Sequence, residues 1–370
     1  MRVAVTGANG FIGQNLTTRL AEKGVTDISL VAHDLDDAGL DAAVRGAALV
    51  YHLAGVNRPQ HADEFATGNQ GFAGRLVAAL ERVNPGACIV YTSSIQATDD
   101  NPYGRSKREA EQDIENYAAR TGSTAMVFRL ANVFGKWSRP NYNSMVATFC
   151  HNIARGLDIT VHDPATAVRL VYIDDVCDTF IALLDPAQRT SGIHAVVPEY
   201  ATTVGDVADH IRGFRDSRST LISDRVGKGL TRALYSTYVS FLEPADFAYR
   251  LPVYADPRGR FSEMLKTPDC GQFSFFTAHP GVTRGEHYHH TKSEKFLVVK
   301  GSANFGFRHI LTGECHQIKT SGDQPEVVET IPGWTHNITN VGADEMIVML
   351  WANETFDRER PDTIAMKVKP

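Results

Sequence analysis

Apolar residues recur at two different periods along the chain, and the change of period divides it. In roughly the first two thirds, short runs rich in β-branched residues alternate with stretches whose apolar positions recur every three or four residues. This alternation predicts a parallel sheet covered by helices. From about Glu243, short strands of period two are separated by Gly, Pro and Asp, which predicts an all-β barrel. We therefore expect an α/β domain at 1–242 and an all-β domain at 243–370.

The individual elements can be assigned from the same periods and from turn residues. In the α/β part the pattern predicts buried strands, with His52 as a core histidine, and it predicts a helix beginning at Pro102 behind an Asn101 cap. The polar stretch 215–232 is typical of the approach to a domain boundary. The expected strands are 2–6, 28–32, 49–55, 88–94, 272–278, 295–300, 303–308, 326–330 and 346–351, and further helices are expected at 174–184 and 203–214.

Composition narrows the function classes. The chain has 370 residues, 43% hydrophobic and 22% charged, with a net charge of -6, which is typical of a soluble globular protein and excludes broad contact with nucleic acid or an anionic membrane. The five cysteines are scattered and include no Cys-x-x-Cys pair, which favours free thiols in a reducing cytosol. With neither a signal peptide nor a membrane-spanning run in the sequence, we expect a cytoplasmic protein.

A glycine motif follows the first strand. Gly7, Gly10 and Gly13 lie between the strand at 2–6 and an amphipathic helix, and this context indicates a dinucleotide site. The glycines permit a tight turn and a close approach of the backbone to a pyrophosphate, whose charge lies at the helix N-terminus. The cofactor residues that we expect are Gly7, Asn9, Gly10, Phe11, Ile12, Gly13, His33, Leu53, Ala54, Gly55, Tyr103 and Lys107.

The end of the second strand bears on the type of cofactor. An NAD site places an acidic residue there to bind the ribose 2′-hydroxyl, whereas this chain has Ala32 and His33. Asp34 lies close by, so an NAD site stays open as an alternative. Because a carboxylate would repel the 2′-phosphate of NADP, its absence at the strand end favours NADP(H).

Tyr103 and Lys107 lie one helical turn apart on the helix that begins at Pro102. Together with the glycine motif and with Ser94 at a strand end, they resemble the Ser-Tyr-Lys site of short-chain dehydrogenases. The chemistry needs this arrangement because a ketone that accepts hydride needs a proton, which a tyrosine supplies more readily beside an ammonium group. Ser94 would hold the carbonyl oxygen, and Ser93 is the alternative, since neighbouring side chains on a strand face opposite sides.

Two further motifs indicate the substrate side. The segments 129–135 and 169–175 resemble motifs of the extended branch of the short-chain dehydrogenases, whose members act on nucleotide sugars. The resemblance implies Asn132 and Arg169 as substrate residues. An anionic diphosphate would need local cations, for which Lys136, Arg139 and Arg169 are candidates.

The all-β part carries a candidate metal site. His287 and His289 are two apart, so both face one side of an extended strand, and Glu294 follows across a short turn. With His336 far downstream, these ligand types suit Zn²⁺, while Fe²⁺ or Mn²⁺ is also compatible. The alternative is a set of solvated strand histidines. The full spacing resembles both cupin motifs, except that Pro332 and Gly333 are adjacent where one residue usually separates them.

With both halves considered, the chain resembles the CapF family of capsular-polysaccharide enzymes, in which an extended short-chain dehydrogenase is fused to a C-terminal cupin. The match covers 52–59, 93–107, 134–144, 234–238, 289–299 and 359–363. The resemblance implies a bifunctional enzyme that uses NADPH and a cupin zinc. Its substrate would be a UDP-activated 4-keto-6-deoxy amino sugar, UDP-2-acetamido-2,6-dideoxy-hexos-4-ulose, converted to the L-talose product on the route to N-acetyl-L-fucosamine.

Chemistry divides this reaction between the two domains. A base in the barrel would remove the acidic C3 hydrogen so that C3 inverts, and the dehydrogenase domain would then reduce C4. The base is left open among His290, Lys295 and His289, the last only if three side chains hold the metal. The alternatives are another 4-keto nucleotide sugar, or a barrel that is only a sensing or dimerising module. We expect a homodimer.

Overall fold

The computed structural model describes residues 1–59, 61, 64–247, 249–289, 292–330, 333–359 and 361–369. The chain forms two compact units. The first comprises Met1–Ile211 and Lys228–Leu242, and the second comprises Arg212–Gly227 and Glu243–Pro370. A division therefore falls between residues 242 and 243, and the segment 212–227 belongs to the second unit.

The first unit is organised around a parallel sheet of six strands. Its order is β2-β1-β3-β4-β5-β8, and every neighbouring pair is parallel. The strands are nearly continuous apolar runs, as burial on both faces of a parallel sheet requires. Their bounds are β1 Val3–Thr6, β2 Ile28–Val31, β3 Leu49–His52, β4 Cys88–Ser94, β5 Ala125–Leu130 and β8 Gly192–His194.

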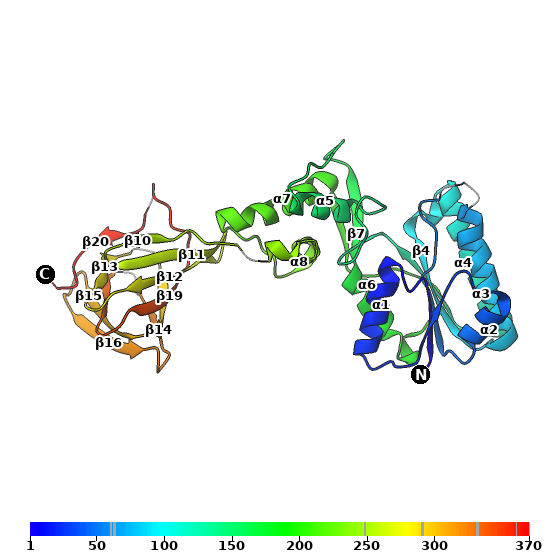
Figure 1. Ribbon diagram of the computed structural model, residues 1–370, viewed down its shortest axis with the longest axis horizontal. Coiled ribbons are helices and arrows are strands. Elements are labelled where there is room, and N and C mark those ends of the chain that lie inside the picture. Colours follow the sequence, from blue (N-terminus) through cyan, green and yellow to red (C-terminus); the bar gives the residue numbers. More distant parts are fainter. Residues whose placement is uncertain are drawn as a thin grey trace. The chain divides into compact units, whose positions relative to one another are not determined.

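Helices cover both faces of this sheet (Figure 1). The helices α2, α3 and α4 pack on one face, where Leu76 and Ile114 join Val50 in a buried core. On the other face Tyr51 stacks on Phe180 of α6, beside α1. This arrangement confirms the predicted parallel sheet covered by helices, and it is a Rossmann-type fold. The helices are α1 Phe11–Glu22, α2 Asp37–Val44, α3 Phe72–Val83, α4 Pro102–Thr121 and α6 Ile173–Ala182.

A smaller sheet and further helices follow. The three-stranded sheet β6-β7-β9 consists of Asn132–Phe134, Ala167–Tyr172 and Glu199–Thr203. Helix α5 spans Met145–Ala154, α7 Val204–Thr220 and α8 Gly229–Val239, so the polar stretch 215–232 contains helical residues at both ends. In the part of the chain that the structure describes, no helix combines the length and apolarity needed to cross a bilayer.

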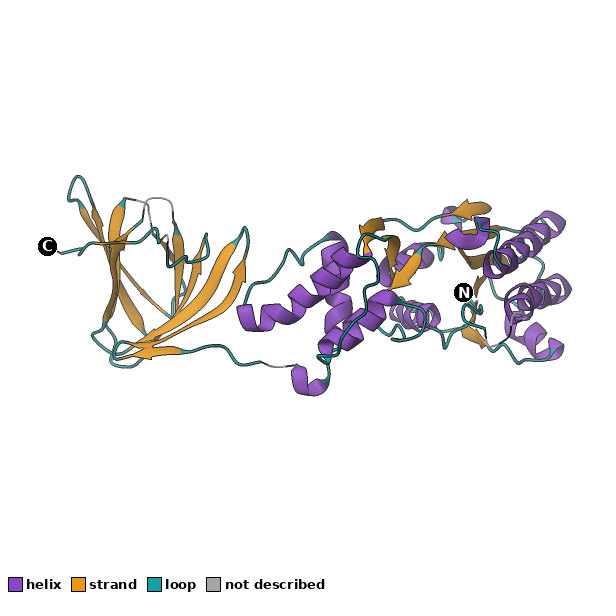
Figure 2. Cartoon of the chain, turned by 90° about the horizontal axis from the view of Figure 1, so that it is seen from above, coloured by secondary structure: helices purple, strands orange, loops and turns teal. Residues whose placement is uncertain are grey.

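The second unit is all-β from residue 254 and consists of two antiparallel sheets, seen as two groups of strands in Figure 2. Phe276, Phe296 and Phe305 lie in the core between the sheets. The predicted all-β class is confirmed. One sheet is β10 Tyr254–Asp256, β11 Gly259–Thr267, β12 Gly271–Ala278, β19 Met346–Ala352, β14 Glu294–Lys300 and β17 Val327–Glu329; the other is β16 Cys315–Ser321, β15 Ser302–His309, β18 Trp334–Asn340, β13 Thr283–Tyr288 and β20 Ile364–Ala365.

Strand β13 contains a bulge that affects the predicted metal site. The register with β18 shifts between Gly285 and His287, and Glu286 has a positive φ of 62°. The Glu286 side chain is fixed by hydrogen bonds from Asn337 and from the backbone N–H of Val368. Beyond the bulge, His287 pairs directly with His336 of β18. The bulge therefore brings two predicted ligands opposite each other.

Candidate active site and metal centre

A glycine turn connects β1 to α1. Gly7 has φ +66°, and a Cβ there would lie 2.7 Å from the backbone nitrogen of Ala54. A Cβ on Gly13 would lie 2.2 Å from the carbonyl oxygen of Gly7. No side chain caps α1, and its first turn has no acidic residue. A turn that only glycine can form, followed by an uncapped helix N-terminus, fits the pyrophosphate of a dinucleotide.

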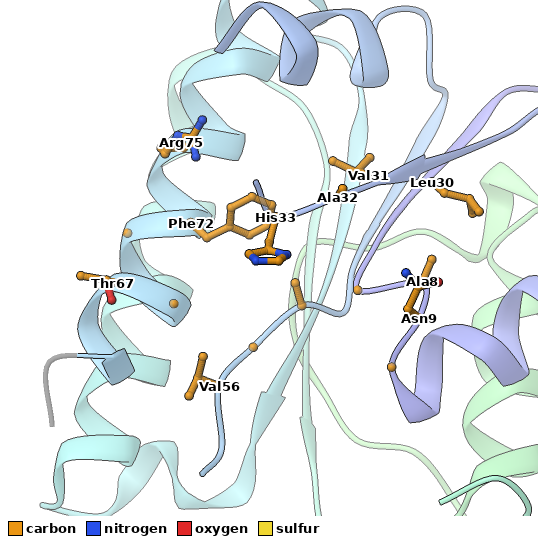
Figure 3. Close-up of a pocket in the computed structure, with 16 residues that line it drawn as sticks. Ala8, Asn9, Leu30, Val31, Ala32, His33, Val56, Thr67, Phe72 and Arg75 are labelled. Atoms are coloured by element: carbon orange, nitrogen blue, oxygen red, sulfur yellow. The ribbon is translucent and has the colours of Figure 1, made fainter. Parts of the chain in front are cut away.

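Two cavities adjoin this turn. The cavity shown in Figure 3, of about 800 Å³, extends from the turn to the end of β2 and the start of α3. The second, of about 860 Å³, extends from the turn to the ends of β4 and β6 and the start of α4. Every predicted cofactor residue lines at least one cavity. His33 and Ala54 line the first; Gly7, Asn9, Gly10 and Gly55 line both; Phe11, Ile12, Gly13, Leu53, Tyr103 and Lys107 line the second.

The start of α4 positions the tyrosine and the lysine. Asn101 caps the helix by accepting a hydrogen bond from the backbone N–H of Gly104, and Pro102 occupies the first position, as predicted. Tyr103 therefore lies in the first helical turn and Lys107 in the next. The Nζ of Lys107 lies 6.0 Å from the centroid of the Tyr103 ring and donates a hydrogen bond to the Thr92 carbonyl. The structure thus places the ammonium group beside the phenol.

Ser93 and Ser94 have different partners at the end of β4. Ser94 is hydrogen-bonded to Tyr103. Ser93 donates to the buried carboxylate of Glu111 at 2.5 Å, and Glu111 also accepts two hydrogen bonds from Arg129. The geometry therefore favours Ser94 as the serine that faces the tyrosine. It also gives Arg129 an ion-pair role within the fold.

Burial sets the protonation of this site. It raises the pKa of Tyr103, against a smaller lowering by the Ser94 hydrogen bond, so the phenol keeps its proton at neutral pH. Burial lowers the pKa of Lys107 to about 8, although Glu111 opposes the shift. His52 is fully buried and hydrogen-bonded to Thr6, and burial lowers its pKa to about 3, which confirms it as a neutral core histidine.

Of the two predicted substrate residues, Asn132 and Arg169, only Asn132 lines the second cavity. It does so together with Arg139 and Tyr142. The Cζ of Arg139 lies 5.0 Å from the centroid of the Tyr142 ring in a cation-π contact. Arg169 does not line that cavity, because its guanidinium pairs with Glu199. The remaining candidate, Lys136, pairs with Asp174. Of the three proposed diphosphate cations, the structure therefore brings only Arg139 to the cavity.

The four predicted metal ligands come together in the second unit. One ligand atom from each of His287, His289, Glu294 and His336 lies within 4.8 Å of the others. The Nε2 atoms of His289 and His336 lie 3.3 and 3.4 Å from Oε2 of Glu294. Neither ring nitrogen of the buried His336 has a hydrogen-bond partner among the described residues. Buried imidazole nitrogens without partners, grouped around a carboxylate, fit a divalent transition metal.

A second layer of contacts orients this quartet. The Nδ1 of His289 contacts the Asp362 carbonyl, which directs Nε2 toward Glu294. Burial alone would raise the pKa of Glu294, but the hydrogen bond with His289, the neighbouring His336 ring and the charge of Lys292 hold it below its usual range. Burial and His336 lower the pKa of His287 to about 4, so that ring is neutral at pH 7 and can donate a lone pair.

Two residues near the quartet escaped the sequence reasoning. Lys292 is buried, with Nζ 3.4 Å from Oε1 of Glu294, and Asp362 accepts the backbone N–H of Lys292. Lys292 stands two positions before Glu294, a spacing that could have identified it; Asp362 carries no local signal. The candidate base Lys295 instead pairs with Glu329 at the surface. The candidate base His290 and the unusual Pro332 lie outside the described residues.

Comparison with known proteins gives matches to both parts of the chain. Residues 3–197 match the NAD dependent epimerase/dehydratase family, and residues 254–364 match the polysaccharide biosynthesis C-terminal domain. A UDP-2-acetamido-2,6-beta-L-arabino-hexul-4-ose reductase of Pseudomonas aeruginosa is 53% identical over 368 residues, covering 100% of this chain and 99% of that protein.

Solved structures extend these matches. The capsular polysaccharide assembling protein CapF from Staphylococcus aureus superimposes with a TM-score of 0.89 and 40% identity, covering 99% of this chain and 100% of that one. A UDP-glucose 4-epimerase of Thermus thermophilus, solved with NAD, matches 65% of this chain and 99% of its own at 18% identity and a TM-score of 0.54, which is a likeness of fold.

Proposed function

The chain belongs to the NAD dependent epimerase/dehydratase family and to the CapF group within it, and on this premise we propose that it is a bifunctional nucleotide-sugar enzyme. The first unit reduces C4 of UDP-2-acetamido-2,6-dideoxy-hexos-4-ulose with NADPH. The second unit first epimerises C3. The product is UDP-2-acetamido-2,6-dideoxy-L-talose, on the route to N-acetyl-L-fucosamine. The Pseudomonas relative is named as a reductase of a 4-keto UDP-amino sugar, which supports the substrate class.

One observation carries the reductase proposal: Ser94, Tyr103 and Lys107 line the same cavity as the glycine turn. Bound NADPH supplies the hydride that C4 accepts. Tyr103 gives its phenolic proton to the C4 oxygen, and Ser94 holds that oxygen by a hydrogen bond. Lys107, an ammonium at pH 7, stabilises the phenolate that the proton leaves behind. Neither the hydride transfer nor the proton transfer forms a covalent bond to the protein.

The quartet in the barrel carries the epimerase proposal. The C4 carbonyl acidifies the C3 hydrogen, and a divalent ion held by His287, His289, Glu294 and His336 would stabilise the charge that develops on the sugar oxygen. A base removes the C3 proton, and return of a proton to the opposite face inverts C3. His289 is the candidate base if three side chains suffice for the metal. Its orientation by the Asp362 carbonyl favours a ligand role.

A second candidate function gives the barrel a dimerising role beside a working reductase. It is favoured by apolar side chains exposed on one sheet of the second unit, Phe273, Val299, Val327 and Met349, which are 39–56% exposed. The two functions are compatible, and we also propose a homodimer. They differ in what happens when the quartet is removed, because a purely dimerising barrel needs no metal for catalysis.

Deuterium exchange tests the proposal. The full-length protein is incubated in heavy water with the UDP-4-keto-6-deoxy-N-acetylhexosamine, with and without NADPH, and C3 deuteration is followed by mass spectrometry. We expect exchange without NADPH, its loss in His287→Ala, and loss of reduction alone in Tyr103→Phe. His309→Ala, a barrel histidine outside the quartet, serves as the control. Exchange that survives both His287→Ala and metal chelation would refute a catalytic barrel.

A further inference from the structure

One cavity beside the glycine turn has an unusual balance of charge. His33 and Arg75 are the only titratable side chains among the described residues that line it, and none of its lining residues is a carboxylate. His33 follows β2, and Arg75 lies in the first turn of α3; both are labelled in Figure 3. A dinucleotide on the glycine turn places its adenosine ribose at the end of the second strand. Both basic groups are therefore close to the ribose position.

Hydrogen bonds from Nε and Nη2 hold Arg75 near the ribose position and leave another donor of its guanidinium open. Its Nη2 donates to the Leu35 carbonyl at 2.7 Å and to Asp37 at 3.1 Å, and its Nε donates to Asp37 at 3.3 Å. Its Nη1 has no partner in the part of the chain that the structure describes. The guanidinium thus spans from α3 to the turn after β2, and part of its donor fork is open.

The acidic residues of this turn do not reach the cavity. Asp34, Asp36 and Asp37 all follow β2, and none of them lines it. Asp36 caps α2 by accepting the Gly39 N–H, and Asp37 is the partner of Arg75. An NAD site needs a carboxylate that accepts hydrogen bonds from the ribose hydroxyl. Asp36 and Asp37 are engaged by these partners, and Asp34 does not line the cavity.

We propose that Arg75, assisted by His33, forms the subsite for the 2′-phosphate of the adenosine ribose and makes the chain selective for NADPH. This inference rests on the proposed reductase function and adds the residue that determines the choice of cofactor. The Arg75 and Asp37 side chains are 42% and 72% exposed, and an exposed pair contributes little to stability. Hydrogen bonds from an arginine fork to phosphate are charge-assisted, and the open Nη1 of Arg75 can donate one to the 2′-phosphate while Nε and Nη2 keep Asp37.

Fragment binding to the full-length protein tests the subsite without turnover. Adenosine 2′,5′-bisphosphate and adenosine 5′-monophosphate differ only in the 2′-phosphate, and isothermal titration calorimetry gives both dissociation constants. We expect the wild type to bind the bisphosphate about tenfold to a hundredfold more tightly, and Arg75→Gln to lose this preference. Asp37→Asn removes the neighbouring negative charge and should strengthen bisphosphate binding.

Arg82 provides a matched control. It lies on the same helix and pairs with Asp41 of α2 as Arg75 pairs with Asp37, but it does not line the cavity. Arg82→Gln should retain the wild-type preference. Equal losses in Arg82→Gln and Arg75→Gln would overturn the assignment. Far-ultraviolet circular dichroism checks folding, and Arg75→Lys, which keeps the charge but not the fork, substitutes if Arg75→Gln unfolds.

The wild-type result separates the two proposals. Binding of NADH and NADPH with equal affinity, with no preference for the bisphosphate, would overturn the 2′-phosphate subsite and leave a nicotinamide-dependent reductase intact. Failure to bind either dinucleotide would overturn the reductase proposal itself.

Discussion

A single methyl group on Gly13 should disable the dinucleotide site. The Cβ of Gly13→Ala would lie 2.2 Å from the carbonyl oxygen of Gly7 and 2.6 Å from the Cα of Ala8. The first contact is about 1.2 Å short of the 3.4 Å at which ordinary contact begins. Both neighbours are backbone atoms, so no flexible side chain can yield. The turn or the start of α1 must therefore move by about an ångström.

The size of that movement sets the expected loss. A displacement of about 1 Å in groups that position a reactant costs about a hundredfold in rate, so reduction should slow by about that factor and dinucleotide affinity should fall with it. The strain also costs about 1–3 kcal/mol of unfolding free energy. Alanine in a helix regains only up to about 1 kcal/mol over glycine. The clash therefore outweighs the gain in helix propensity.

Two measurements on each variant test this reasoning. Calorimetric titration with NADPH gives the affinity, and urea unfolding gives the stability. Gly74→Ala is the control, because Gly74 lies inside α3 and its Cβ would meet only the end of the Asp113 side chain, at 3.6 Å. We expect that control to bind normally. If Gly13→Ala also bound NADPH as the wild type does, the turn would not be the pyrophosphate site.

Three further predictions concern charged groups. Reduction should slow as pH rises through about 8, where Lys107 loses its proton. The pH–rate profile of Lys107→Arg should lack this fall in rate, because arginine stays charged. An unchanged fall in the variant would assign the titration to another group. Glu111→Ala leaves two buried or half-buried partners unpaired and should cost about 1–3 kcal/mol in urea unfolding. The half-buried Glu81→Ala, whose partner Arg120 is exposed, should cost less than about 1 kcal/mol, and equal losses would contradict the structural role of Glu111. Glu294→Gln should reduce the metal content measured by atomic absorption, whereas Glu329→Gln on the barrel surface should not; a metal content unaffected by both would place the ion elsewhere.

The change of hydrophobic period was sufficient to predict both fold classes. Strands buried on both faces and helices with one apolar face are local properties, so β4, at Cys88–Ser94, and the cap at Asn101 were predicted within one residue. Segment 215–232 shows the limit of this reasoning. Its polar composition indicated the approach to a domain boundary but did not reveal that α7 continues to Thr220 and that α8 begins at Gly229, because exposed helices carry mostly polar residues.

The sites were predictable as far as spacing could group them. Tyr103 with Lys107, and His287 with His289, are close in sequence and on one face of their element. The bulge at Glu286 that sets His287 opposite His336 depends on long-range pairing, which the sequence pattern does not encode. The ion-pair partner of a charged residue is equally absent from the local sequence pattern. Arg169 was expected at the substrate, but Glu199, thirty residues away, occupies its guanidinium.

The chemistry of the proposed substrate fixes the order in which the two units act. The C3 hydrogen is acidic only while C4 is a carbonyl, so epimerisation must precede reduction. Proton removal and return at C3 are reversible, whereas hydride transfer through the Tyr103 site removes the carbonyl and ends the exchange. On the proposed scheme the reductase would determine which C3 epimer is trapped, through the shape of the cavity that Asn132 and Arg139 line. Stereochemical fidelity would then reside in the first unit, although inversion itself belongs to the second.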